Sequence, residues 1–183
     1  MNDKYELLQE SITIHNHTLH RIKALRSFGN VKAGDLGGYI ESEKNLGHGG
    51  NCWVYDNAKV YENAWVRDSA RVYENAWVYG AAKIYGHSGI CGNAEVFGDT
   101  LVAQTTNISG FAKVYGNAWV SGAVLVAGNA EICGDAGIYG RAWVSVDVNL
   151  DYGIWNKRVK IDGKHYLISI TLKKVLVGIG LDE

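Results

Sequence analysis

Aliphatic residues recur at every sixth position through the middle of the chain. Sixteen consecutive hexads between residues 54 and 149 begin with Val or Ile, without an insertion. The fifth position of each hexad is small or β-branched, most often Ala, while the residues beside the aliphatic position are mostly polar or aromatic. Side chains alternate across a strand, so the aliphatic residue points inward and its neighbours point outward. This pattern predicts a repeat of short strands joined by corners.

The third and fourth positions of the hexad predict the corners. The third position becomes Gly at Gly80 and in most later hexads, and the fourth is often Asn or Asp. Because Gly and Asn tolerate left-handed backbone, we expect the bend there. Three hexads would close a triangular coil, and successive coils would stack as parallel strands about 4.8 Å apart. We therefore predict an all-β fold, a single-stranded parallel β-helix of about five coils.

The hexad resembles that of the hexapeptide-repeat, left-handed parallel β-helix proteins, in which an aliphatic and a small residue stand four positions apart. The resemblance covers about 54–149, and it alone implies the left-handed coil. The second position departs from the family, with Tyr or Phe where Gly or an acid is usual. The repeats, together with the head "GDLGGYIESEKNLGHGGNCWVYDNA", look like those of uncharacterised β-helical proteins of phages and prophages.

The two ends of the chain lack the hexad and are predicted to cap the coil, whose open strand edges need cover. Residues 1–47 form the N-terminal cap, with a hairpin turning at Asn16 and a Gly-rich connection. Residues 48–155 form the β-helix. Residues 156–183 form the C-terminal cap, with a hairpin turning at Asp162 and Gly163.

Composition restricts the partners and the compartment. The net charge is −1 and the pI about 6.6, which argues against a protein that binds nucleic acid through bulk charge. No apolar stretch is long enough to span a bilayer, and no signal peptide is apparent. Three cysteines without a CxxC motif favour a reduced cytoplasm, which would be that of the host cell if a phage encodes the chain.

The outward residues of the first two coils mix aromatic and basic side chains. A planar anionic ligand needs stacking and positive charge together. We expect a small anionic or aromatic ligand, or a host protein, to bind here, with a solvated ladder of side chains as the alternative. The predicted binding residues are Trp65, Arg67, Arg71, Tyr73, Trp77, Tyr79, Lys83 and Tyr85.

Two of the three outer faces carry small or apolar residues at their middle rungs, where a solvated strand would be charged. Exposed apolar area of this kind usually marks an interface. Hexapeptide β-helices often associate as trimers, so the resemblance implies a homo-oligomer, with a trimer favoured. Terminal caps folded over these faces are the alternative. The predicted interface residues are Leu101, Ala103, Trp119, Leu125 and Ala127.

Few residues suggest catalysis. Hexapeptide-repeat acyltransferases place a His base on a loop or at a subunit boundary. Here His87 occupies a corner and His48 the entrance of the coil; we interpret the first as a turn residue in left-handed backbone and the second as structural. They remain the alternative catalytic bases. His15, His17 and His20 lack a fourth ligand for a metal. We expect no metal and no cofactor.

These observations lead to three hypotheses. The first is a non-enzymatic, oligomeric binding protein of phage type, which could act in counter-defence by sequestering a host factor or a signalling nucleotide. The second is a hexapeptide-repeat acyltransferase with its site at a subunit boundary. The third is a structural or virion component. Val and Ala at six-residue spacing build the interior of a coil, so function must lie on the outward positions and the caps.

Overall fold

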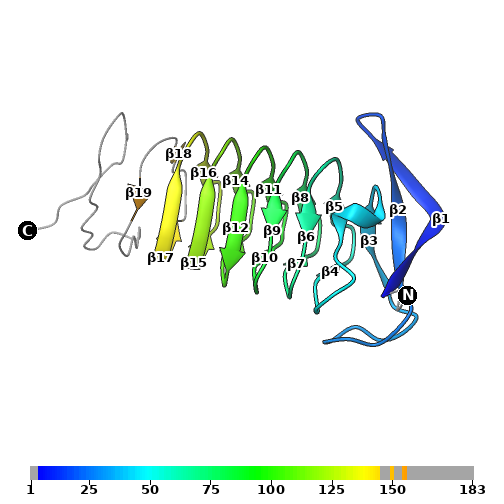
Figure 1. Ribbon diagram of the computed structural model, residues 1–183. Coiled ribbons are helices and arrows are strands. Elements are labelled where there is room, and N and C mark those ends of the chain that lie inside the picture. Colours follow the sequence, from blue (N-terminus) through cyan, green and yellow to red (C-terminus); the bar gives the residue numbers. More distant parts are fainter. Residues whose placement is uncertain (1–3, 145–148, 151–153, 156–183) are drawn as a thin grey trace, which may run out of the picture.

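Short parallel strands stack in three columns in the computed structural model, which describes residues 4–144, 149–150 and 154–155 (Figure 1). The interior is lined by the aliphatic and small positions of the hexads; Val78, Ala82 and Ile84, for example, are fully buried. Burying one β-branched side chain and one Ala per hexad supplies a continuous apolar core. The predicted parallel β-helix is confirmed.

The first column is called face A, and the strands of the N-terminal cap continue the same sheet. Its strands pair in the order β3, β5, β8, β11, β14, β16 and β18. Their bounds are β3 (Leu36–Ile40), β5 (Lys59–Val60), β8 (Trp77–Val78), β11 (Glu95–Val96), β14 (Lys113–Val114), β16 (Glu131–Ile132) and β18 (Asn149–Leu150).

From face A the chain runs to face C and then to face B in each coil. Toward the C-terminal end, longer strands join face C to face B. Residues 119–126 and 137–144 run from face C around the corner into face B as single strands, which pair with each other. Face B contains β4 (Trp53–Val54), β7 (Arg71–Val72), β10 (Gly89–Ile90) and β13 (Asn107–Ile108). Face C contains β6 (Trp65–Val66), β9 (Lys83–Ile84) and β12 (Leu101–Gln104); the shared strands are β15 (Trp119–Val126) and β17 (Gly137–Val144), and β19 (Ile154–Trp155) pairs with β17.

The corners bend at the third position of the hexad rather than at the fourth. Asp56, Glu62, Asp68 and Glu74 have φ between 52° and 59°, and from Gly80 onward the described corners have Gly at this position except at Gln104, whose φ is 64°. No fourth-position Asn among the described residues has a positive φ. Each of the four acids accepts a hydrogen bond from the third-position N–H of the next coil, such as Gly80 N to Glu62 Oε2 at 2.7 Å. This bond offsets the cost of left-handed backbone in a residue other than Gly.

The N-terminal cap begins with the predicted hairpin. Strands β1 (Tyr5–Ile14) and β2 (His17–Ala24) pair antiparallel. His15 and Asn16 have φ of 48° and 69°, as a two-residue hairpin turn requires. The turn at Asn16 is therefore confirmed.

The Gly-rich connection differs from the expectation, because it contains strand β3. This strand pairs antiparallel with β2 and parallel with β5, so coil stacking starts before residue 48. A Cβ atom on Gly38 would lie 2.5 Å from the Ala58 carbonyl oxygen. The glycine lets the cap approach the first complete coil. A short 3-10 helix, η1 (Glu43–Asn45), follows, and Leu46 then bridges to Val66 on face C.

The remaining expectations about the ends concern residues that the structure does not describe. The predicted C-terminal cap, 156–183, lies outside the described residues.

Within the described ranges, none of the helices has the length and apolar character needed to cross a membrane.

Candidate functional site

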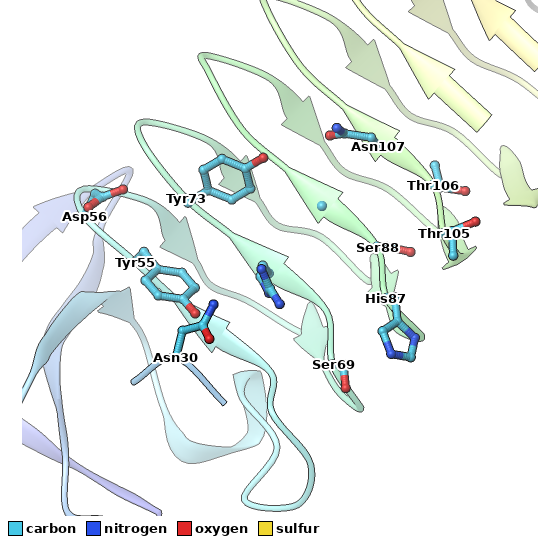
Figure 2. A pocket seen from close by; sticks show the side chains of 12 residues that line it. Asn30, Tyr55, Asp56, Ser69, Tyr73, His87, Ser88, Thr105, Thr106 and Asn107 are labelled. Atoms are coloured by element: carbon cyan, nitrogen blue, oxygen red, sulfur yellow. The ribbon is translucent and has the colours of Figure 1, made fainter. Parts of the chain in front are cut away.

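A cavity of about 540 Å³ opens on face B near the N-terminal cap (Figure 2). Tyr55 and Tyr73 stand on two successive coils, and Asn30 reaches toward Tyr55 from a loop of the cap. His87 and Ser69 lie along the corner that joins face C to face B. The cavity therefore combines coil residues with one loop that is distant in sequence.

The hollow exists because side chains shrink along face B. The sixth-position column reads Trp53, Arg71, Gly89 and Asn107 on successive coils. At Gly89 a Cβ atom would meet Asn107 Oδ1 at 3.4 Å and Tyr73 Cε1 at 3.7 Å, which are ordinary contacts. Its φ is not in the left-handed region. Backbone geometry therefore does not require glycine at this position, and the missing side chain leaves the space.

His87 is exposed at the edge of this cavity. Its backbone N–H donates to the Gln104 carbonyl oxygen at 2.6 Å, which fixes the residue in the coil. Its ring has no hydrogen bond or ion pair within the described part of the chain. The preceding residue, Gly86, takes the left-handed conformation with φ of 72°, so the interpretation of His87 as the left-handed turn residue is wrong.

The Ser and Thr hydroxyls and the Asn107 amide in the cavity fall into two groups. Those of Ser88, Thr105 and Thr106 donate to backbone carbonyls at 2.8, 3.1 and 2.8 Å. The side chains of Ser69 and Asn107 make no side-chain hydrogen bond within the described residues. The first group holds the corner in place, and the second is available to a ligand.

The two tyrosines of the cavity are neutral at ordinary pH. A hydrogen bond between the side chains of Tyr73 and Cys91, followed by burial, raises the pKa of Tyr73 to about 12. Burial also raises the pKa of Tyr55 above its usual value. Both phenols therefore present rings and O–H groups rather than charge.

His48 lies under the N-terminal cap instead of in a cavity. Its ring stacks on Tyr5 with centroids 4.5 Å apart and an angle of 8°. Its Nδ1 atom accepts a hydrogen bond from the Lys4 backbone N–H at 3.3 Å, and its Nε2 atom lies 4.0 Å from Glu43 Oε2. Both ring nitrogens of His48 therefore have partners, and of the two alternative bases only His87 has a ring without a hydrogen bond or ion pair among the described residues.

The predicted binding residues do not form one continuous surface. Arg71 and Tyr73 lie at the cavity on face B. Trp77 and Tyr79 lie on face A, where Tyr79 stacks on Tyr61 with centroids 5.1 Å apart. The other four follow the strands of face C: Trp65, Arg67, Lys83 and Tyr85. One small ligand cannot contact all three faces.

The aromatic column of face A is a ladder of stacked rings. Successive centroids from Tyr79 to Phe97 and from Phe97 to Tyr115 are 4.8 and 4.9 Å apart, with ring planes within 4°. Each ring covers the face of the next, which leaves only edges for a partner. This geometry favours stabilisation of the sheet over a stacking platform for ligands.

The predicted interface residues occupy two faces. Leu101, Ala103 and Trp119 lie on face C, and Leu125 and Ala127 lie on face B. Trp119 is 48% exposed, whereas Ala103 is only 3% exposed. Leu125 and Ala127 belong to the same face as the cavity, farther toward the C-terminal end of the coil.

The three histidines of the hairpin do not converge on one site: His17 and His20 have separate hydrogen-bond partners, and His15 lies at the turn. His17 Nδ1 pairs with Glu41 Oε1 at 3.0 Å, and His20 Nδ1 lies 3.0 Å from the Leu8 carbonyl oxygen. His15 lies at the turn, with its ring 6.2 Å from that of Trp77. Within the described residues no three His, Cys, Asp or Glu side chains are placed to hold a metal ion.

Comparison with known proteins finds a similarity over a short stretch of the chain. The chain is 42% identical over 52 residues to the "Uncharacterized acetyltransferase YdcK" of Escherichia coli (strain K12). The match spans 28% of this chain and 16% of that protein. No family model matches the chain.

This similarity corrects the first functional hypothesis. It favours the acyltransferase alternative over a non-enzymatic binding protein, and nothing supports the phage type. The first hypothesis was wrong because the hexads determine only the coil. A coil without an inserted loop is compatible with a binding protein and with an enzyme.

Proposed function

We propose that the chain is an acyltransferase that moves an acyl group, such as acetyl, from a thioester to a hydroxyl or amine. The observation that carries the proposal is the free ring of His87 at the edge of a cavity of about 540 Å³. The similarity to a protein named as an acetyltransferase supports the same reaction class.

His87 acts as the general base in this proposal. Its imidazole takes the proton from the acceptor hydroxyl or amine while the oxygen or nitrogen attacks the thioester carbonyl carbon. The carbon–sulfur bond then breaks, and the departing thiolate takes a proton from the imidazolium. Ser69 and Asn107 have the uncommitted polar groups that could orient the two substrates.

The site is proposed to lie at a subunit boundary. Leu125 and Ala127 continue face B beyond the cavity, so a second copy seated there would add a wall to it and exclude water. A neighbouring subunit would also contact face C, where Trp119, 48% exposed, is the apolar anchor. Native mass spectrometry tests this part: wild type should be oligomeric, and Trp119→Asp should be monomeric. A monomeric wild type would contradict it.

The reaction is tested by thiol release from acetyl-CoA with a panel of small hydroxyl and amine acceptors. His87→Gln should lower the rate by about 100-fold or more. His48→Gln is the matched control, because it removes the other alternative base, and its folded fraction should keep the wild-type rate. Thiol release that survives in His87→Gln would refute the assignment of the base.

A further inference from the structure

Arg71 brings a permanent positive charge to the cavity. Among the residues that line the cavity it is the single Lys or Arg. Its guanidinium makes no ion pair or side-chain hydrogen bond within the described part of the chain. A planar guanidinium offers paired N–H donors that match a carboxylate or phosphate. Among the described residues these donors have no protein acceptor.

The surroundings of Arg71 also favour an anion. The uncommitted side chains of Ser69 and Asn107 can both donate hydrogen bonds, and the neutral Tyr73 phenol carries no competing charge. The acid at the cavity, Asp56, lies at the opposite corner, and its Oδ2 atom already accepts a hydrogen bond from Glu74 N at 3.0 Å. A ligand with an oxyanion therefore finds donors rather than repulsion here.

Arg71 and His87 are close enough to act on one small molecule. Arg71 pairs in register with Gly89 on the next coil, and His87 precedes Gly89 by two residues. One coil step and two residue steps place the two Cα atoms about 8 Å apart. Both side chains are long, so the functional groups can serve two parts of the same molecule.

We propose that the acceptor is a small molecule with a carboxylate or phosphate, which Arg71 binds while its hydroxyl or amine faces His87. This inference rests on the proposed acyl transfer. The anion belongs to the acceptor and not to an acyl-CoA donor, because the whole pantetheine arm separates the thioester of that donor from its nearest phosphate. Arg71 and His87 line one cavity with their Cα atoms about 8 Å apart, so groups turned into that cavity lie closer together than the ends of the extended arm.

The anion subsite is tested directly by NMR titration with inorganic phosphate. The ring signals of His87, assigned from their absence in His87→Gln, should shift saturably in wild type. Arg71→Gln should abolish the shift. Arg67→Gln is the matched control, because this arginine lies on face C over the Trp65 ring at 4.8 Å, and it should respond like wild type. Equal shifts in Arg71→Gln and wild type would overturn the subsite.

The assignment to the acceptor is tested by kinetics with paired acceptors, one with a free carboxylate and one with its methyl ester. The ester should react at least about tenfold more slowly in kcat/KM, a difference of about 1.4 kcal/mol. Arg71→Gln should remove this preference and raise the KM for the acceptor alone. A rise in the KM for acetyl-CoA instead would place the anion on the donor and refute the inference.

The two proposals fail separately. If no acceptor supports thiol release from acetyl-CoA, the acyltransferase proposal fails, and the phosphate titration still decides whether Arg71 holds an anion. If transfer occurs without any preference for the charged acceptor, the proposed function stands and the inference about the acceptor is refuted.

Discussion

Filling the hollow at Gly89 is the sharpest structural test of where the site lies. Gly89 has an ordinary strand conformation, and the space beside its Cα atom is the cavity. A Phe ring covers on the order of 150–250 Å², so Gly89→Phe should occupy the volume between Arg71 and Asn107. We expect kcat/KM for acyl transfer to fall at least about 100-fold.

The fold should tolerate this change, and a smaller substitution measures how well. In Gly89→Ala the new Cβ atom meets Asn107 Oδ1 at 3.4 Å and nothing closer. Removing the freedom of Gly from the unfolded chain should then raise the free energy of unfolding by about 0.4–1 kcal/mol. Urea unfolding followed by circular dichroism measures the difference.

The control for the filled cavity is Lys83→Phe, which adds the same ring at an exposed sixth position on face C of the same coil. It should keep the wild-type rate. Two results would refute the reasoning. A fully active Gly89→Phe would show that the cavity is not the site, and a Gly89→Ala protein destabilised by more than about 1 kcal/mol would show that the glycine serves the backbone.

Three further predictions concern the corners and the aromatic ladder. Gly92→Ala should lower the free energy of unfolding by about 2 kcal/mol or more, because φ is 71° and the Cβ atom would lie 2.8 Å from the Gly110 carbonyl oxygen; an unchanged urea midpoint would contradict this. Glu74→Ala keeps a φ of 59° and loses the 2.6 Å bond to Gly92 N, so it should be less stable than Glu74→Gly by about 1 kcal/mol; equal stabilities would argue against strain at the corner. Burial raises the pKa of Tyr61 from 10.0 to about 12, so the folded state retains a proton that the unfolded state loses, and stability should fall between pH 10 and 12 by at most about 3 kcal/mol. Unfolding at pH 8 and pH 11 should show a smaller fall in Tyr61→Phe, and an identical fall would remove Tyr61 as a cause.

The coil could be predicted because the six residues of each hexad determine one strand and the corner that follows it. The first coil was missed for a physical reason that the sequence still records. Ile40 and Leu46 are six residues apart and occupy the inward positions opposite Val60 and Val66. The next inward aliphatic residue, Val54, follows Leu46 by eight residues, so an insertion of two hides the period. The signal was present, and a search that allowed one insertion would find it.

The candidate site could be predicted only in part. His87 was recognisable as the single His of the hexads, but which corner residue turns left-handed depends on hydrogen bonds between coils. The acids of the first coils provide those bonds, whereas the Gly that recurs from Gly80 onward already marks the third position in the sequence. The cavity depends on Gly89 together with Asn30, a residue of the cap. Contacts between distant segments of this kind are set by tertiary packing and leave no periodic signal.

Chemical rescue of His87→Ala by free imidazole tests the central claim most directly. The substitution removes the base and leaves a space at the edge of the cavity, which a small imidazole can enter. The proposed mechanism requires that acetyl transfer fall about 100-fold or more and recover in proportion to the added imidazole, with no recovery in His48→Ala. Undiminished transfer by His87→Ala without imidazole would contradict the account.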